Sequence, residues 1–184
     1  MGRSLAFRLQ QIRGFVGHQD LATAKAGRGI ELSNEILIRP VQPSDFQQWK
    51  VLWDGYNAFY GREGETALPE ETTQMTWSRF FDAYEPVHAL VADHSGELLG
   101  LTHFIFHRST ISIAPTCYLQ DLFTLESARG KGVGRALIEQ VYQRARQVGC
   151  SRVYWHTHES NKTAMKLYNK IAEKSGFVVY RKPL

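Results

Sequence analysis

The stretch of sequence that decides the fold is Leu122-Phe123-Thr124-Leu125, followed after three residues by Arg129-Gly130-Lys131-Gly132-Val133-Gly134. The first run is typical of a buried strand, and an apolar helical stripe begins within the second. A strand that leads through a glycine-rich turn into a helix suits phosphate, because backbone N–H groups converge there and the helix N-terminus is partly positive. The glycine spacing fits neither the Walker A pattern nor the dinucleotide fingerprint. The stretch therefore predicts a phosphate-binding loop of another kind, with a simple tight turn as the alternative.

Helix and strand signals alternate along the rest of the chain. Apolar residues at period two indicate strands, and apolar residues at period 3.6 indicate helices. In chain order we expect strand 36–40, helices 44–60 and 70–84, strands 87–92, 98–106 and 117–125, helix 132–148, strand 151–155, helix 161–174 and strand 176–180. The order βααβββαβαβ predicts an α+β fold in which a sheet lies between helices.

The positive charge of the chain is concentrated at its start. Of 22 basic and 18 acidic side chains, residues 1–30 hold five and one, which leaves 17 of each sign in the remainder. A neutral remainder argues against a face that tracks nucleic acid. We expect residues 1–34 to be a basic N-terminal extension, with flexibility favoured over a transit peptide or a packed amphipathic helix. Residues 35–184 are expected to form one domain.

The apolar runs and the cysteines bear on location. No apolar run approaches the roughly 20 residues that cross a bilayer, so we expect no membrane-spanning segment. The two cysteines, Cys117 and Cys150, are too few for a disulfide scaffold and do not have a metal-ligand spacing. We therefore expect a cytoplasmic protein that uses no metal.

Several motifs resemble one known superfamily. Arg129-x-x-Gly132-x-Gly134 after an apolar strand resembles the acetyl-CoA signature of the Gcn5-related N-acetyltransferases (GNAT). The run 118–123 looks like the spermidine/spermine and thialysine acetyltransferases, and 53–60 and 153–161 look closer still to the yeast Hpa2/Hpa3 group. The resemblance implies the GNAT fold, with a mixed, mostly antiparallel central sheet flanked by helices. It also implies transfer of an acetyl group from acetyl-CoA to a primary amine, and a possible homodimer.

The resemblance assigns the co-substrate site residue by residue. Leu122, Phe123 and Thr124 would bring backbone amides to the acetyl carbonyl and the pantetheine arm. The pyrophosphate would be held by the loop and the first helical residues, which are Arg129, Gly130, Lys131, Gly132, Val133, Gly134 and Arg135.

The helix after the last predicted turn completes this site. Asn161, Ala164 and Tyr168 match the family's Asn-x-x-Ala-x-x-x-Tyr pattern, in which Asn161 would contact pantetheine and Tyr168 the sulfur. Their spacing of i, i+3 and i+7 puts them on one helical face. A phenol with a pKa near 10 can donate a proton to a thiolate whose thiol has a pKa of about 8.5. A packing role beside Leu167 is the alternative for Tyr168.

The acceptor half is less defined by sequence. An alkyl ammonium with a pKa near 10.4 must lose a proton before it attacks. The polyamine acetyltransferases have a proposed glutamate base where this chain has Gln120, so other groups are needed. The candidates are Asp121, Glu159, His156 and His158. Asp121 lies in an otherwise apolar strand, so it must be paired or titrate unusually.

An aromatic stripe and the residues around the missing base are expected to meet the substrate. Trp53, Tyr56 and Tyr60 recur at helical spacing, which is typical of core, although part of the stripe could line an amine pocket. Gln120, His158 and Glu159 would complete the acceptor side. A small-molecule amine, polyamine-like or amino-acid-like, is the leading substrate class. Protein or histone lysine acetylation and a catalytically silent acetyl-CoA-binding module remain as alternatives.

Overall fold

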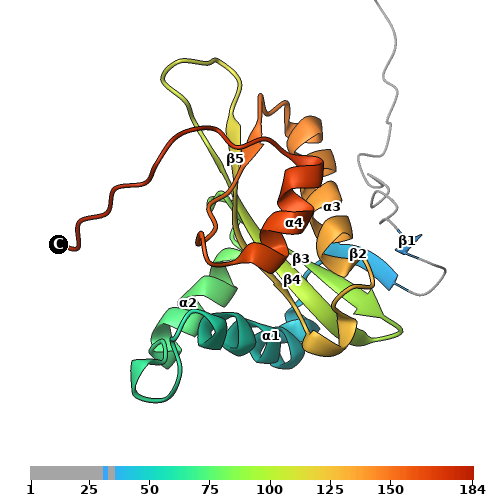
Figure 1. Ribbon diagram of the computed structural model, residues 1–184. Coiled ribbons are helices and arrows are strands. Elements are labelled where there is room, and N and C mark those ends of the chain that lie inside the picture. Colours follow the sequence, from blue (N-terminus) through green and yellow to red (C-terminus); the bar gives the residue numbers. More distant parts are fainter. Residues whose placement is uncertain (1–30, 33–35) are drawn as a thin grey trace, which may run out of the picture.

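The computed structural model describes residues 31–32 and 36–184, shown in Figure 1. Its strands and α-helices are, in chain order, β1 (Glu31–Leu32), β2 (Ile36–Pro40), α1 (Phe46–Phe59), α2 (Glu70–Arg79), β3 (Val87–His94), β4 (Glu97–His107), β5 (Thr116–Thr124), α3 (Val133–Val148), β6 (Val153–Tyr154) and α4 (Lys162–Ile171). Residues 1–30, most of the predicted extension, lie outside the described residues. The short strand β1 is additional to the predicted elements.

The strands form a single sheet in the order β1-β2-β3-β4-β5-β6. Neighbours pair antiparallel from β1 to β5, and only β5 and β6 run parallel. The predicted mixed, mostly antiparallel sheet flanked by helices is therefore confirmed. The parallel pair needs a long connection, and α3 supplies it.

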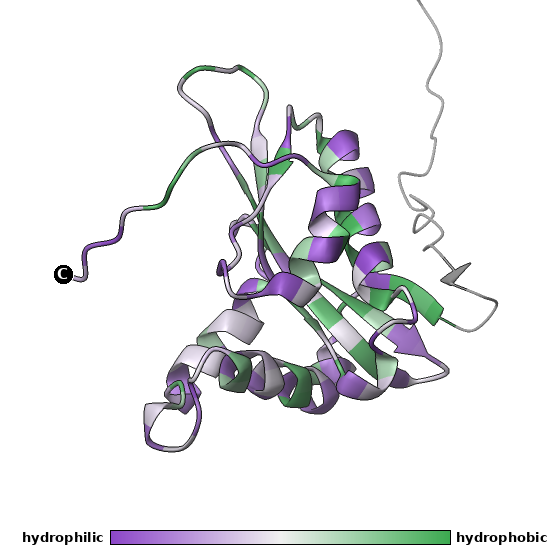
Figure 2. Ribbon diagram, in the orientation of Figure 1, coloured by the Kyte–Doolittle hydropathy of each residue, from purple (hydrophilic) through white to green (hydrophobic). Residues whose placement is uncertain are grey.

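Helices cover both faces of the sheet (Figure 1). On one face α1 buries Trp49 and Leu52 against β3 and β4, with Trp77 of α2 and the following Phe80 packed beside them. On the other face α3 buries the predicted stripe, including Val133, Leu137 and Val141. Figure 2 shows the hydrophobic colour concentrated on the strands that the helices cover. Two apolar layers, one on each side of the sheet, thus hold the domain together.

The end of the chain differs from the prediction. Residues 172–184 form neither helix nor strand, and Phe177 and Tyr180 are 88% and 93% exposed. The strand predicted over 176–180 is therefore wrong. Its apolar, β-branched composition suits a strand, but a strand also needs a partner, and β6 is only two residues long. In Figure 1 this segment runs away from the body of the domain.

Smaller differences concern helix ends and the cysteines. Helix α2 ends at Arg79, and a 3-10 turn from Pro43 to Asp45 precedes α1. Asp45 accepts hydrogen bonds from Arg39 and from the backbone of Gln42, which fixes the entry into α1. Both cysteines are free thiols. Across the described residues, every helix is too short or too polar to span a bilayer.

Candidate active site

A β-bulge at Gln120 sets the direction of the residues that follow it. On β4, His103 pairs with Asp121 and the next residue pairs with Leu119, so Gln120 has no opposite residue. Side chains alternate along a regular strand, and one extra residue reverses the alternation beyond it. Leu119 accordingly packs in the core on the α3 side, whereas Phe123 packs on the α1 side. Asp121, two residues before Phe123, shares its face and lies under α1.

Asp121 is buried and paired, as its apolar surroundings require. His103 Nδ1 lies 3.0 Å from Asp121 Oδ2, and Trp49 Nε1 lies 2.9 Å from His103 Nε2. An indole N–H can only donate, so Nε2 of His103 accepts and carries no proton. The single ring proton is therefore on Nδ1 and is donated to the carboxylate. The neutral imidazole holds Asp121 in place without cancelling its charge.

Tyrosines surround this carboxylate. Burial, with the charge of Asp121 as the second cause, raises the pKa of Tyr56, Tyr60 and Tyr118. The three phenols therefore stay protonated in the ordinary pH range. Trp53 is 6% exposed and stacks on Tyr56 with ring centroids 5.4 Å apart, so it supports the tyrosines from the core.

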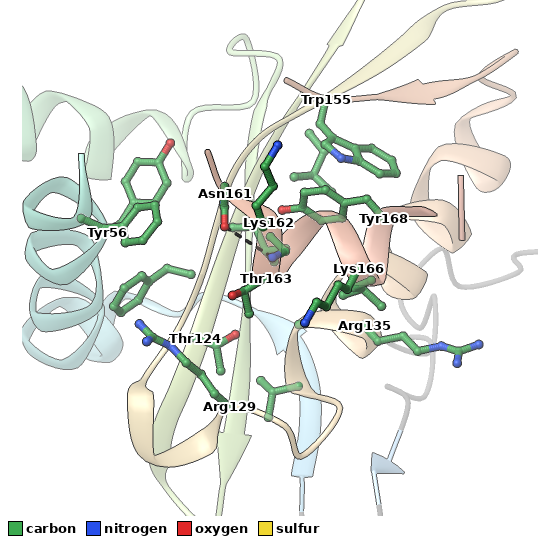
Figure 3. A pocket seen from close by; sticks show the side chains of 18 of the residues that line it. Tyr56, Thr124, Arg129, Arg135, Trp155, Asn161, Lys162, Thr163, Lys166 and Tyr168 are labelled. Carbon is green, nitrogen blue, oxygen red and sulfur yellow. Dashed lines mark hydrogen bonds between the residues drawn. The ribbon is translucent and has the colours of Figure 1, made fainter. Parts of the chain in front are cut away.

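A cavity of about 940 Å³ opens where β5 and β6 separate. The parallel pairing covers only Cys117 and Tyr118, so the described structure leaves the edge of β5 from Leu119 to Thr124 without a strand partner on that side. Figure 3 shows Tyr56 of α1 on one side of the cavity and Tyr168 of α4 on the other. An unpaired strand edge offers its N–H and C=O groups to an extended ligand that contains amides.

The predicted phosphate loop forms one end of the cavity. Gly130 and Gly132 have φ of +76° and +85°, the left-handed region that glycine adopts without strain. Gly132 is the N-cap residue of α3 and supplies no side-chain cap. The first N–H groups of the 16-residue helix are thus left for a ligand, as an anion-binding terminus requires. Gly134 and Arg135 also line the cavity, whereas Lys131 is not among its lining residues.

Positive charge lines the cavity, and no carboxylate of the described residues does. Its cationic lining residues are Arg129, Arg135, Lys162, Lys166 and Lys170. The three lysines stand at i, i+4 and i+8 of α4 and form one stripe. Sequence reasoning missed them, although this spacing was a usable signal. Backbone donors and cations together suit a polyanionic ligand such as the pyrophosphate of coenzyme A.

Helix α4 contributes Asn161 and Tyr168 to the lining. The Asn161 side chain accepts from the backbone N–H of Ala164 at 3.4 Å, so it caps the helix. Burial, followed by the nearby Tyr60, raises the pKa of Tyr168 to about 12. Its ring meets Trp155 edge to face with centroids 5.3 Å apart, which fixes its direction.

The structure brings most of the expected residues to the cavity. In addition to those above, the lining includes Gln120, Leu122, Phe123, Thr124, Val133 and Ala164. His156 lines the cavity as well, and its Nδ1 lies 3.3 Å from the Tyr118 hydroxyl. His158 and Glu159 are not among the lining residues, and His158 Nδ1 lies 2.6 Å from Ser160 Oγ. The further lining residues that sequence reasoning did not propose are Phe59, Leu119, Ala128, Trp155, Ser160, Thr163 and Leu167.

The described residues offer no cluster of side chains suited to a metal. Within residues 31–32 and 36–184, no group of three or more His, Cys, Asp and Glu side chains could hold an ion. The cavity is therefore described by its backbone donors, cations and phenols.

Comparison with known proteins agrees with this geometry. The sequence pattern of the acetyltransferase (GNAT) family matches residues 49–172. D-amino-acid N-acetyltransferase HPA3 of Saccharomyces cerevisiae is 34% identical over 153 residues, which cover 82% of this chain and 92% of that protein. Thialysine N-epsilon-acetyltransferase of Mus musculus is 30% identical over 87 residues, or 45% of this chain and 49% of that protein. Among solved structures, aminoglycoside N-acetyltransferase AAC(6')-Iy in complex with CoA superposes with a TM-score of 0.68 at 18% sequence identity. The match covers 80% of this chain and 94% of that chain, and it shows a similarity of fold.

Proposed function

Since the chain belongs to the GNAT acetyltransferase family and is an acetyl-CoA-dependent N-acetyltransferase, we propose that it acetylates the primary amine of an amino-acid-like small molecule. The observation that carries the proposal is the tyrosine-walled end of the cavity next to the buried carboxylate of Asp121. HPA3, a relative that matches over most of both chains, is named for D-amino acids, which supports the same substrate class. A polyamine-like amine is the second candidate, because the run 118–123 resembles that of the spermidine/spermine acetyltransferases. The shorter match to thialysine N-epsilon-acetyltransferase, named for an amino acid, agrees with the first candidate.

The donor would bind along the loop and the free strand edge. The N-terminus of α3, with Arg129 and Arg135, would hold the pyrophosphate. The unpaired edge of β5 from Leu122 to Thr124 would pair with the amides of the pantetheine arm and direct an N–H group at the acetyl oxygen. When bound, acetyl-CoA supplies a thioester carbonyl that an amine can attack.

The acceptor would enter on the tyrosine side. Its ammonium has a pKa near 10.4 in water and must lose a proton to become a nucleophile. Tyr56 lines the cavity and is a neighbour of Asp121, which does not itself line it. We assign a proton path in which the ammonium proton passes to the phenol oxygen of Tyr56 while the phenol proton passes to the Asp121 carboxylate. His103 and Trp49 keep that carboxylate in position.

Tyr168 would act on the leaving group. With its pKa raised to about 12, its phenol is a weaker acid than a thiol with a pKa of about 8.5. Complete proton transfer to the departing sulfur would cost about 5 kcal/mol, by the difference of roughly 3.5 pKa units. Tyr168 is therefore proposed to donate a hydrogen bond that stabilises the thiolate as it forms, rather than to release its proton outright.

A turnover screen tests the proposed function. Thiol release from acetyl-CoA would be measured with free amino acids of both configurations, with polyamines and with lysine-containing peptides. Turnover with amino acids above the other two classes is expected, and Tyr168→Phe should lower kcat by about tenfold or more. Tyr180→Phe, in the exposed C-terminal segment, serves as the control. Turnover with peptides alone would favour a protein acetyltransferase, and tight acetyl-CoA binding without turnover would favour a silent module.

A further inference from the structure

We propose that Arg62 forms a subsite for the carboxylate of the acceptor, so that the enzyme selects amino acids over amines that lack an acid group. This inference rests on the proposed function and specifies the residue that would determine its substrate class. Arg62 lies in the turn that follows α1, beyond the residues that line the cavity. Its anchoring, its position and its lack of an acidic partner each point to this role.

Arg62 is fixed in place by its contacts with α1. Its Nε donates to the side-chain oxygen of Asn57 at 2.7 Å, and its backbone N–H donates to the Asn57 carbonyl at 2.9 Å. Asn57 is 3% exposed, and its own side-chain nitrogen donates to the carbonyl of Trp53 at 2.9 Å. The guanidinium is therefore held by a buried asparagine and does not move freely in solvent. Such anchoring reduces the entropy lost when a ligand binds.

The position of Arg62 connects it to the acceptor side of the cavity. Its guanidinium carbon lies 5.7 Å from the ring centre of Tyr56 and 5.5 Å from that of Tyr60. Both tyrosines line the cavity. Burial, followed by the charge of Asp121, raises the pKa of both phenols, and the charge of Arg62 acts in the opposite direction. The two tyrosines thus stand within the fields of a cation and an anion that are supplied by different elements.

The guanidinium has no acidic partner in the described part of the chain. Arg39 and Arg135 are each within 3.0 Å of a carboxylate oxygen, whereas no carboxylate of the described residues lies within 4.0 Å of Arg62. Within the described residues Arg62 uses only Nε in a side-chain hydrogen bond, to Asn57, which leaves the N–H groups of its two terminal nitrogens available. Their planar, forked arrangement matches a carboxylate and can bind it through two hydrogen bonds.

The pairing of these charges fits an α-amino acid. Its ammonium would meet the phenols backed by Asp121, and its carboxylate would meet Arg62. A polyamine carries only positive charges and would be repelled by the same guanidinium. The arrangement therefore separates the two substrate classes that share a primary amine.

Matched substrates isolate this role. The rate of acetylation of D- and L-phenylalanine would be compared with that of the two phenylalaninamides, which keep the amine and ring but lack the carboxylate. In Arg62→Gln, KM for the amino acid should rise by about 10- to 100-fold, the usual effect of losing a charge-assisted hydrogen-bond pair. KM for the amide should change by less than about twofold, because the amide has no carboxylate for Arg62 to bind. Arg62→Lys keeps the charge but loses the fork, and should give an intermediate rise.

Controls separate this result from a damaged fold and from a wrong function. KM for acetyl-CoA should be the same in Arg62→Gln as in the native enzyme, although the melting temperature should fall because the buried Asn57 oxygen loses its donor. Arg79→Gln, on the exposed side of α2, should change KM for neither the amino acid nor the amide. An equal loss for amino acid and amide in Arg62→Gln would overturn the carboxylate subsite. So would native enzyme that acetylates the amides but not the amino acids. Native enzyme that acetylates only polyamines or peptides would overturn the proposed amino-acid function itself.

Discussion

His103 and Asp121 face each other across the β4–β5 pair, with His103 Nδ1 3.0 Å from Asp121 Oδ2. The pair forms one step beyond the bulge at Gln120, which turns the carboxylate toward α1. Trp49 of α1 fixes the imidazole tautomer from the other side. Three elements thus cooperate to keep one carboxylate buried next to the tyrosines. A group held this firmly in a low-dielectric surrounding has a strong effect on its neighbours.

Removal of the charge on Asp121 should reduce catalysis and leave donor binding intact. In Asp121→Asn the side chain keeps its shape and can still accept from His103, but it no longer attracts the proton of the acceptor. We expect kcat to fall by about 100-fold or more, the usual contribution of a proton acceptor. KM for acetyl-CoA should be unchanged. Asp54→Asn, on the exposed side of α1, is the matched control, and an equal effect there would exclude a specific role for Asp121.

The same pair should show coupling in stability. His103→Leu leaves the carboxylate without its donor and should lower the free energy of unfolding by about 1–3 kcal/mol. The double variant His103→Leu/Asp121→Leu removes both polar groups, and its loss should be smaller than the sum of the single losses. Urea unfolding of the four proteins measures this coupling. Additive losses would show that the hydrogen bond contributes little to the fold.

Gly55 of α1 should resist replacement because Phe123 packs directly against it. A Cβ at this position would lie 2.7 Å from Cζ of Phe123. Helix propensity alone predicts that Gly55→Ala stabilises the helix by about 1 kcal/mol. Overpacking should outweigh this gain and destabilise the protein by about 1–3 kcal/mol. Chemical denaturation decides the sign, and the shorter side chain in Phe123→Leu should rescue Gly55→Ala if the contact is the cause.

The glycine loop and its helix were predictable because their signals are local. Gly130 and Gly132 are needed for left-handed backbone, and the apolar stripe of α3 repeats at helical spacing. The apolar neighbours of Asp121 left two alternatives, a paired carboxylate or an unusual titration, and the structure shows the pairing. The partner of Asp121 could not be predicted, because a strand sequence alone gives no register. The bulge at Gln120 is visible only against β4, and it changes which face of the sheet Asp121 occupies.

Other differences have a similar cause. Phe177-Val178-Val179-Tyr180 has the composition of a strand, but strand formation depends on a neighbour that the composition does not describe. Trp53, Tyr56 and Tyr60 form one stripe in the sequence, but their positions in the structure differ. Trp53 is buried in the core, and the two tyrosines line the cavity. Local patterns thus predict elements, and contacts between distant elements decide which side chains reach the cavity.

Left-handed backbone in the loop should matter for the donor. Alanine at Gly132, where φ is +85°, should strain the turn by about 1–2 kcal/mol and raise KM for acetyl-CoA by roughly tenfold. Gly149→Ala is the control: it strains the backbone in the same way, because Gly149 has φ of +79°, but it lies at the other end of α3. It should lower stability by a similar amount and leave this KM unchanged. A rise in KM for both variants would point to general damage to α3 rather than to loss of the loop geometry.

The raised pKa of Tyr168 should be visible as a pH dependence of stability. Its phenol titrates near 10.0 when unfolded and at about 12 in the folded protein, so the folded state binds the proton more tightly. This stabilising contribution is complete below pH 10 and is lost as the pH rises from 10 to 12. Over that interval it amounts to about 3 kcal/mol, at roughly 1.4 kcal/mol per pKa unit. Tyr168→Phe should therefore lose less free energy of unfolding between pH 10 and 12 than the native protein, while the exposed control Tyr180→Phe should follow the native curve. Parallel curves for the native protein and Tyr168→Phe would show that the phenol titrates alike in both states, and hence that burial against Trp155 does not hold its proton.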